Sequence, residues 1–181
     1  EPLQRALDTT EPSKIQTFLY AVPMLYEGAK KPEASLAAAR PVLHAAMRQA
    51  DTAYIAATSL ARMQLAARQY PQTLQSLQQA ATARPPEQKL GALPNRELAG
   101  LIAMDLMRAS RASAPDVSSQ ADALVRKIMQ PADTSVDFVL AYAKSLIDLK
   151  RYDDALLALK TVLKKAPANV EAWALQGGIH M

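Results

Sequence analysis

Small and apolar residues recur three and four positions apart along most of this chain, which is the spacing of one buried face of a helix. The clearest case lies between residues 136 and 168, where the pattern runs in two stretches separated by Lys150 and Arg151. Pro167 ends the second stretch, because proline lacks the amide N–H that a continuing helix needs. The pattern predicts two helices joined by a short turn. The residues on the predicted inner faces are Val139, Tyr142, Ala143, Leu146, Ala155, Leu159 and Val162.

The same spacing occurs earlier in the chain with less regular intervals. In the unit that begins at Ile15, Ala34 and Ala38 are expected on the inner face of the second helix. Pro23 and Pro41 fall inside predicted helices of that unit, where proline is expected to bend them. The sequence therefore predicts successive helix pairs and a partial last unit. Their ranges are 15–53, 54–95, 96–135, 136–169 and 170–181.

The stretch from Val136 resembles a tetratricopeptide repeat (TPR), a two-helix unit with a period of about 34 residues. Counted from Val136, the small-residue position 8 is Ala143 and position 20 is Ala155. The closing proline at position 32 is Pro167. Further matches are Leu159 at position 24, Val170 at position 1 of the next unit, and Trp173 and Gly177 at its positions 4 and 8.

The resemblance implies an all-α fold, a right-handed α-solenoid of stacked antiparallel helix pairs. About four pairs are expected, in a single domain over residues 1–181, with partial units at both ends. Because the first and last stretches look like half units, the chain is expected to be part of a longer array. A generic α-solenoid with one TPR-like unit is the alternative.

The composition of the 181 residues adds little chemistry. The formal net charge is +4 and there is no cysteine, which excludes disulfides and thiolate ligands. Lys and Arg are scattered among acidic residues, which disfavours nucleic-acid binding, and no apolar run is long enough to predict a transmembrane segment. His44 and His180 lie in different units, and Asp153 and Asp154 fall in the first turn of a helix, where carboxylates complement the helix dipole. We expect no catalytic residues, no cofactor and no metal.

In TPR proteins, positions 2, 5, 9, 12 and 13 line a concave face that holds a peptide or a helix of a partner protein. The Lys and Asn that grip carboxylate tails in some members are missing, since position 5 is Leu19, Thr58 or Leu140. A chaperone tail is therefore not the expected partner. The groove residues that the resemblance implies are Leu19, Tyr26, Ile55, Thr58, Arg62, Leu65, Asp137, Leu140, Lys144, Ile147 and Asp148, with Gln16, Pro23, Glu27 and Ala66 at the remaining positions.

The function that this sequence favours is a non-catalytic scaffold for protein–protein interaction. Its Ala-, Gln- and Arg-rich composition is similar to that of TPR arrays of GC-rich Proteobacteria, which suggests a bacterial envelope or secretion assembly. The expected compartment is the bacterial periplasm or cytoplasm, with the periplasm favoured. Two alternatives stay open: a regulatory or substrate-recruiting domain of a larger enzyme, and self-association through apolar residues of the incomplete ends. Those end residues are Leu3, Leu7, Trp173, Leu175 and Ile179.

Overall fold

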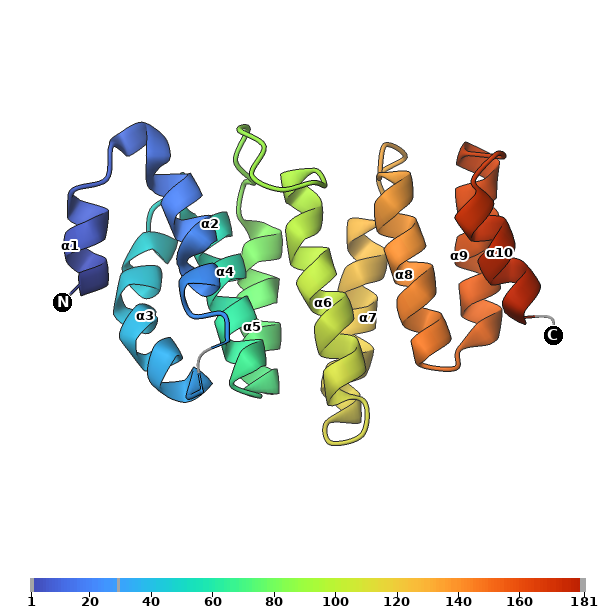
Figure 1. The fold of residues 1–181 in the computed structure, drawn as a ribbon, viewed down its shortest axis with the longest axis horizontal. Helices are drawn as coiled ribbons and strands as arrows, with labels where there is room; N and C mark the ends of the chain where they lie inside the picture. The colour runs from blue at the N-terminus through green and yellow to red at the C-terminus, as the bar shows by residue number, and fades with distance from the viewer. Residues whose placement is uncertain (1, 29, 180–181) are drawn as a thin grey trace. The chain divides into compact units, whose positions relative to one another are not determined.

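The computed structural model describes residues 2–28 and 30–179, which form an all-helical structure (Figure 1). Helix accounts for 74% of the described residues, which form ten α-helices and no strand. Neighbouring helices pack in pairs, so the predicted all-α class is confirmed. The chain divides into two compact units, an N-terminal unit that ends at Ile102 and a C-terminal unit that begins at Ala103.

The N-terminal unit is built around one helix, α4 (Ala53–Ala66), which packs against α2, α3 and α5. Ten residues of α4 are buried, as expected for a helix with neighbours on most sides. Pro32 and Pro71 lie in the first turns of α3 and α5. The amide N–H groups of a first turn have no partner within the helix, so proline, which lacks this N–H, loses no hydrogen bond there. The other elements are α1 (Pro2–Asp8), a 3-10 turn (Pro12–Lys14), α2 (Ile15–Leu25), α3 (Pro32–Met47), α5 (Tyr70–Thr82), a second 3-10 turn (Asn95–Glu97) and the start of α6 (Leu98–Ser110).

The C-terminal unit contains a helix pair, α8 and α9, with α10 packed on α9. Ser135 caps α8, because its hydroxyl oxygen accepts a hydrogen bond from the amide N–H of Phe138 at 3.2 Å. Phe138 itself is the largest of the fully buried side chains among the described residues. The helices of this unit, after the end of α6, are α7 (Pro115–Ile128), α8 (Val136–Asp148), α9 (Tyr152–Lys165) and α10 (Val170–Ile179).

The turns within the pairs α4–α5 and α8–α9 have the same construction. Each contains one residue in the left-handed region, Arg68 with φ 57° and Lys150 with φ 59°. In each turn, the residue after the left-handed one donates a hydrogen bond from its amide N–H to the carbonyl five residues before it. This bond ends the first helix in the manner of a Schellman motif. These bonds run from Gln69 to Gln64 at 2.9 Å and from Arg151 to Leu146 at 2.8 Å.

Replacing Lys150 by valine is expected to destabilise the C-terminal unit by about 1–2 kcal/mol, because a β-branched side chain is strained at positive φ. The Lys150→Gly variant is expected to be as stable as the wild type or slightly more stable, since glycine adopts this conformation freely. Urea denaturation followed by the fluorescence of Trp173, the only tryptophan in the chain, measures both changes. Equal stability of the two variants would contradict the assigned turn.

The second helix of each pair buries residues in one repeating pattern. Ala39 of α3 and Thr73 of α5 hold equivalent places 34 residues apart (73 − 39), and Ala121 of α7 and Ala155 of α9 are also 34 apart (155 − 121). In each of the four helices, the residues three, four and seven positions after this first residue are also buried or half-buried. The four sets are Ala39, Val42, Leu43, Ala46; Thr73, Ser76, Leu77, Ala80; Ala121, Leu124, Val125, Ile128; and Ala155, Ala158, Leu159, Val162.

This pattern corrects the register expected for the first unit. Ala34 and Ala38 are exposed, whereas Ala39 and Leu43 are buried. The cause is the length of the connection between the two helices. Residues 26–31 separate α2 from α3, whereas only residues 67–69 separate α4 from α5 and only residues 149–151 separate α8 from α9. A longer connection moves the second helix along the sequence without changing which pattern it buries. Pro23 and Pro41 do lie inside α2 and α3, as expected.

Candidate functional site

Four of the residues predicted to line a partner-binding groove are buried in the structure. They are Leu19, Ile55, Thr58 and Leu140, all at positions 2 and 5 of their units. The Thr58 hydroxyl donates to the carbonyl of Ile55 within its own helix, at 3.0 Å. Their side chains pack inside the protein, so they do not offer a surface to a partner. This corrects the groove expected from the sequence.

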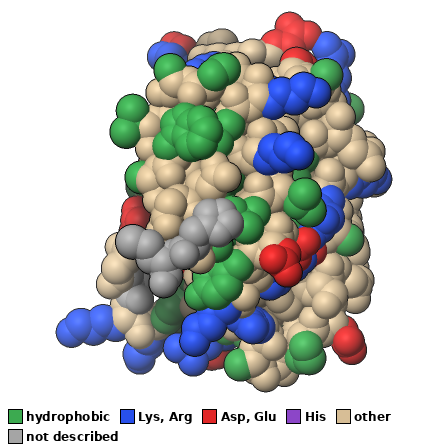
Figure 2. Space-filling model, turned by 90° about the vertical axis from the view of Figure 1, so that its right-hand side faces the viewer, with side chains coloured by type: hydrophobic (Ala, Val, Ile, Leu, Met, Phe, Trp, Pro, Cys, Tyr) green, Lys and Arg blue, Asp and Glu red, His purple; other side chains and the backbone are tan. Residues whose placement is uncertain are grey.

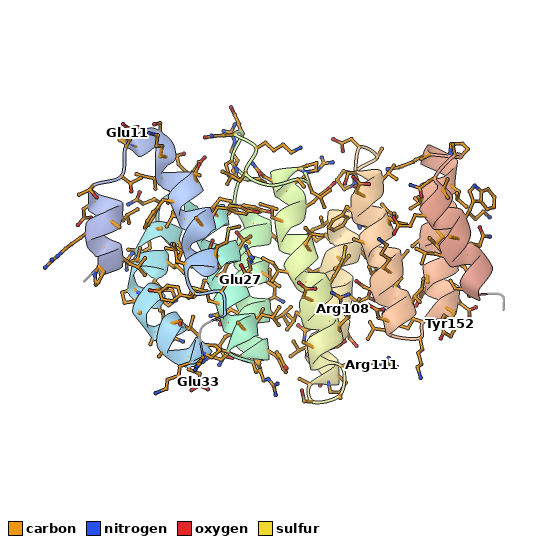
Figure 3. The ribbon with its side chains drawn as sticks, viewed as in Figure 1. Glu11, Glu27, Glu33, Arg108, Arg111 and Tyr152 are labelled. Carbon is orange, nitrogen blue, oxygen red and sulfur yellow. The ribbon has the colours of Figure 1, made fainter. Side chains whose placement is uncertain are left out.

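Other predicted groove residues come together in the N-terminal unit. Pro23, Tyr26 and Glu27 at the end of α2 share one hollow of about 240 Å³ with Arg62 and Ala66 at the end of α4. We call it the α2–α4 hollow. Glu27 is labelled in Figure 3. The hollow is completed by Gly28, Pro32, Ser35 and Met63.

The α2–α4 hollow combines apolar walls with two charges. Pro23, Met63 and the Tyr26 ring supply the apolar surface, while Arg62 and Glu27 supply one charge of each sign. Within the described chain, neither Arg62 nor Glu27 forms an ion pair. A few polar groups in an apolar concavity are the usual make-up of a binding site, and these two charges are available to a ligand.

Two of the charged residues predicted to line the groove in the C-terminal unit form ion pairs within the protein, unlike Arg62 and Glu27. Lys144 of α8 pairs with Glu171 of α10 at 2.5 Å, and Asp148 of α8 pairs with Arg108 of α6 at 3.0 Å. These pairs join successive first helices, and Arg108 is labelled in Figure 3. Arg108 was missed, although it is position 13 of the unit from residue 96, as Asp148 is of its own unit. The remaining predicted residues are Asp137, which is exposed, and Leu65, Ile147 and Gln16, which are half-buried.

A charged network that the sequence did not predict joins α7, α8 and α9. The carboxylate of Asp122 accepts hydrogen bonds from the Tyr142 hydroxyl and from Arg126 at 3.1 Å, and pairs with Arg151 at 3.1 Å. Arg151 also donates two bonds to Asp154, at 2.9 and 2.6 Å. The hydrogen bond from Arg151 lowers the pKa of Asp154, and burial, followed by the bond to Asp122, raises the pKa of Tyr142.

These groups hold one another in place instead of facing a common reactant. Asp122 has three donors, and the guanidinium of Arg151 is divided between two carboxylates. A hollow of about 350 Å³ lies beside them, lined in part by Arg111 and Ser118. Arg111, labelled in Figure 3, donates to the carbonyl of Leu149, so it ties the α6–α7 turn to the α8–α9 turn. The arrangement supports the packing of the unit.

The remaining expected sites can be placed briefly. His44 is exposed on α3, and His180 lies outside the described residues. The described part of the chain contains no group of three or more His, Cys, Asp or Glu residues that could hold a metal ion. In that same part, no helix has both the length and the apolar character to cross a membrane.

The apolar residues proposed for self-association differ in exposure. Trp173 is 55% exposed on α10, whereas Leu175 and Ile179 of that helix and Leu3 and Leu7 of α1 are half-buried. Figure 2 shows the face that includes α10, where hydrophobic side chains lie singly or in small groups among Lys and Arg. Gly177, which the sequence places at the small-residue position 8 of the last unit, is exposed, and a Cβ atom there would meet none of the described atoms of other helices within 4 Å.

Comparison with known proteins gives no match: no protein-family model, no curated protein and no solved structure matches the chain.

Proposed function

We propose that this chain is a non-catalytic scaffold that binds a peptide or helix of a partner protein in the α2–α4 hollow. One observation carries the proposal. Pro23, Tyr26, Glu27, Arg62 and Ala66 hold groove positions in the repeat register, and all five line the same hollow. They come from the ends of two helices that are far apart in the sequence. Because five residues at predicted groove positions also line one hollow, we favour this hollow as the binding surface.

The proposal includes a helical-repeat architecture of the TPR type, a right-handed solenoid. It is supported by the two 34-residue intervals between equivalent buried residues and by the two matching left-handed turns. The wider intervals elsewhere reflect longer connections between helices. Such units bury their apolar faces against their neighbours, which suits a protein that presents a surface instead of enclosing a catalytic cleft.

The residues of the hollow indicate what a partner segment would carry. An apolar side chain fits against Pro23, Met63 and the Tyr26 ring. A carboxylate on the partner would pair with Arg62, and an amino or guanidinium group with Glu27. The favoured partner is thus a short segment, extended or helical, with an apolar anchor flanked by a charge of each sign.

The Arg62→Glu variant is expected to lose a partner that the wild type binds, with an affinity at least about tenfold weaker, because one charge-assisted bond becomes a repulsion. A pull-down identifies the candidate, and isothermal titration with the purified partner gives both affinities. The Tyr26→Ala variant tests the apolar wall in the same way. Arg5→Glu is the matched control, since Arg5 is exposed on α1 outside the hollow.

The proposal fails if Arg62→Glu and Tyr26→Ala bind the purified partner as tightly as Arg5→Glu and the wild type do. Far-ultraviolet circular dichroism must show that all three variants stay helical, so that a loss of binding is not a loss of folding.

A further inference from the structure

The two matching helix pairs differ at one buried contact. Because their turns are equivalent, each residue of α4–α5 corresponds to the residue 82 positions later in α8–α9 (150 − 68). Gln64 then corresponds to Leu146, and Ser76 corresponds to Ala158. All four residues are more than nine-tenths buried. The same helix contact is therefore polar in the N-terminal unit and apolar in the C-terminal unit.

The polar version of this contact is the more costly one. The Ser76 hydroxyl donates to the side-chain oxygen of Gln64 at 2.7 Å, which satisfies part of the buried hydrogen-bonding capacity. Even a satisfied buried pair adds little stability over an apolar pair of similar shape. The pair Leu146 and Ala158 shows that this packing does not need polar residues. Departures of this kind are expected where a site is built.

A second hollow, which we call the glutamine hollow, lies over Gln64 and Ser76 between α3, α4 and α5. Its volume is about 490 Å³. Arg40 and His44 are four residues apart on α3 and so share one face of that helix, and Arg40 donates to Gln69 at 3.3 Å. None of the described lining residues is acidic, and His44 is the only one of them with an aromatic ring. The remaining lining residues are Leu60, Gln69, Gln72, Gln75 and Gln79.

The helices around the glutamine hollow carry an excess of positive charge. Residues 32–82, which span α3, α4 and α5, contain four arginines and two acidic residues, Glu33 and Asp51, which leaves a net charge of +2. This charge attracts an anionic ligand towards the segment that forms the hollow.

We propose that the glutamine hollow binds an acidic peptide segment in an extended conformation. Arg40 and His44 can donate to its carboxylates. Each glutamine amide can both donate and accept, which matches the N–H and C=O groups of a peptide backbone. The imidazole of His44 is the only aromatic ring among the described lining residues, so the hollow lacks the series of rings on which successive bases of a single-stranded nucleic acid stack. This site shares no lining residue with the α2–α4 hollow, so it stands apart from the proposed function.

Fluorescence anisotropy with the whole 181-residue protein tests this site. The probe is a short fluorescein-labelled peptide in which glutamate alternates with serine, and the comparison peptide has glutamine in place of glutamate. The glutamate peptide is expected to bind at least about tenfold more tightly than the glutamine peptide. Arg40→Gln is expected to weaken its binding about tenfold or more. Arg5→Gln, on α1 and outside both hollows, is expected to leave that binding largely unchanged.

The double variant Gln64→Leu/Ser76→Ala provides an independent readout. It copies the apolar contact of the C-terminal unit, so its thermal midpoint is expected to equal or exceed that of the wild type. Its affinity for the glutamate peptide is expected to fall. A stable protein with weakened binding cannot be explained by unfolding.

Three outcomes would overturn the proposal. The first is that the glutamate peptide does not bind at millimolar concentration, or that Arg40→Gln binds it as the wild type does. The second is that a folded Gln64→Leu/Ser76→Ala variant keeps full affinity. The third is that an oligothymidylate binds more tightly than the peptide and is weakened equally by Arg40→Gln, which would identify a nucleic-acid phosphate site instead.

Discussion

Replacing Phe138 by alanine is expected to lower the free energy of unfolding of the C-terminal unit by about 3–5 kcal/mol. Phe138 lies near the start of α8 and is the largest of the fully buried side chains among the described residues. Removing its ring loses the transfer free energy of the buried carbons and leaves a cavity that the surrounding helices fill only in part. A loss of this size is a large share of the stability of an ordinary domain.

Urea denaturation measures this loss, with the fluorescence of Trp173 as a reporter from the same unit. The matched control is Leu157→Ala, because Leu157 is 66% exposed on α9 and its truncation opens no cavity. The control is expected to change stability by no more than about 0.5 kcal/mol. A loss for Phe138→Ala as small as that of Leu157→Ala would contradict the assigned core.

The pair α8–α9 could be predicted from the sequence because its two helices are joined by a short turn. The turn at Lys150 and Arg151 leaves no freedom in the register between the helices, so the apolar spacing alone places both buried faces. The same reasoning failed for α3. Lengthening a connection costs little free energy, so nothing in the spacing of apolar residues indicates that residues 26–31 separate α2 from α3.

The candidate sites were only partly predictable. A groove position tells which way a side chain points from its own helix, but not how far a neighbouring helix covers it. Leu19 and Leu140 are covered for this reason. Lys144 and Asp148 point as expected, but their partners Glu171 and Arg108 belong to other helices, which the repeat register alone does not bring together. Lys144 and Asp148 are therefore paired, whereas Arg62 and Glu27 of the α2–α4 hollow are not paired within the described residues.

The glutamine hollow did leave a signal in the sequence. Once the two turns are aligned, Gln64 and Ser76 stand opposite Leu146 and Ala158, and the difference is visible without coordinates. The predicted units that begin at residues 54 and 136 already give that alignment, because their starts are also 82 residues apart (136 − 54). The turns are equivalent because Arg68 and Lys150 share a left-handed conformation, and only the structure shows it.

The long connection after α5, residues 83–94, is organised by the side chain of Asn95. Asn95 accepts a hydrogen bond from the amide of Leu90 at 3.0 Å and donates to the carbonyls of Pro86 and Gln88 at 2.8 and 2.6 Å. The backbone carbonyl of Asn95 in turn accepts from the hydroxyl of Tyr54 on α4, at 2.5 Å. The connection is thus fastened to the central helix of its unit.

Replacing Tyr54 by phenylalanine is expected to destabilise the N-terminal unit by about 1–3 kcal/mol. The Tyr54 hydroxyl is buried, donates to the carbonyl of Asn95 and accepts from the amide of Ala99 at 3.3 Å. Phenylalanine keeps the ring and its packing, so the loss measures only the buried partners left without a hydrogen bond. Urea denaturation followed by circular dichroism gives the value, and Tyr152→Phe, at a half-exposed tyrosine on α9, is the control.

The contribution of Tyr54 is also expected to depend on pH. Burial raises the pKa of Tyr54 well above its ordinary value near 10, and the nearby carboxylate of Glu97 raises it further, while the bond from Ala99 acts in the opposite direction. Because the folded protein favours the neutral hydroxyl, this stabilisation is fully present below pH 10 and is lost as the pH rises towards the pKa of the folded state. The stability difference between the wild type and Tyr54→Phe should therefore shrink above pH 10.

The difference between the wild type and Tyr152→Phe should change less over the same range. A constant difference for Tyr54→Phe would mean that the hydroxyl ionises as readily in the folded protein as in the unfolded chain, and would contradict its burial.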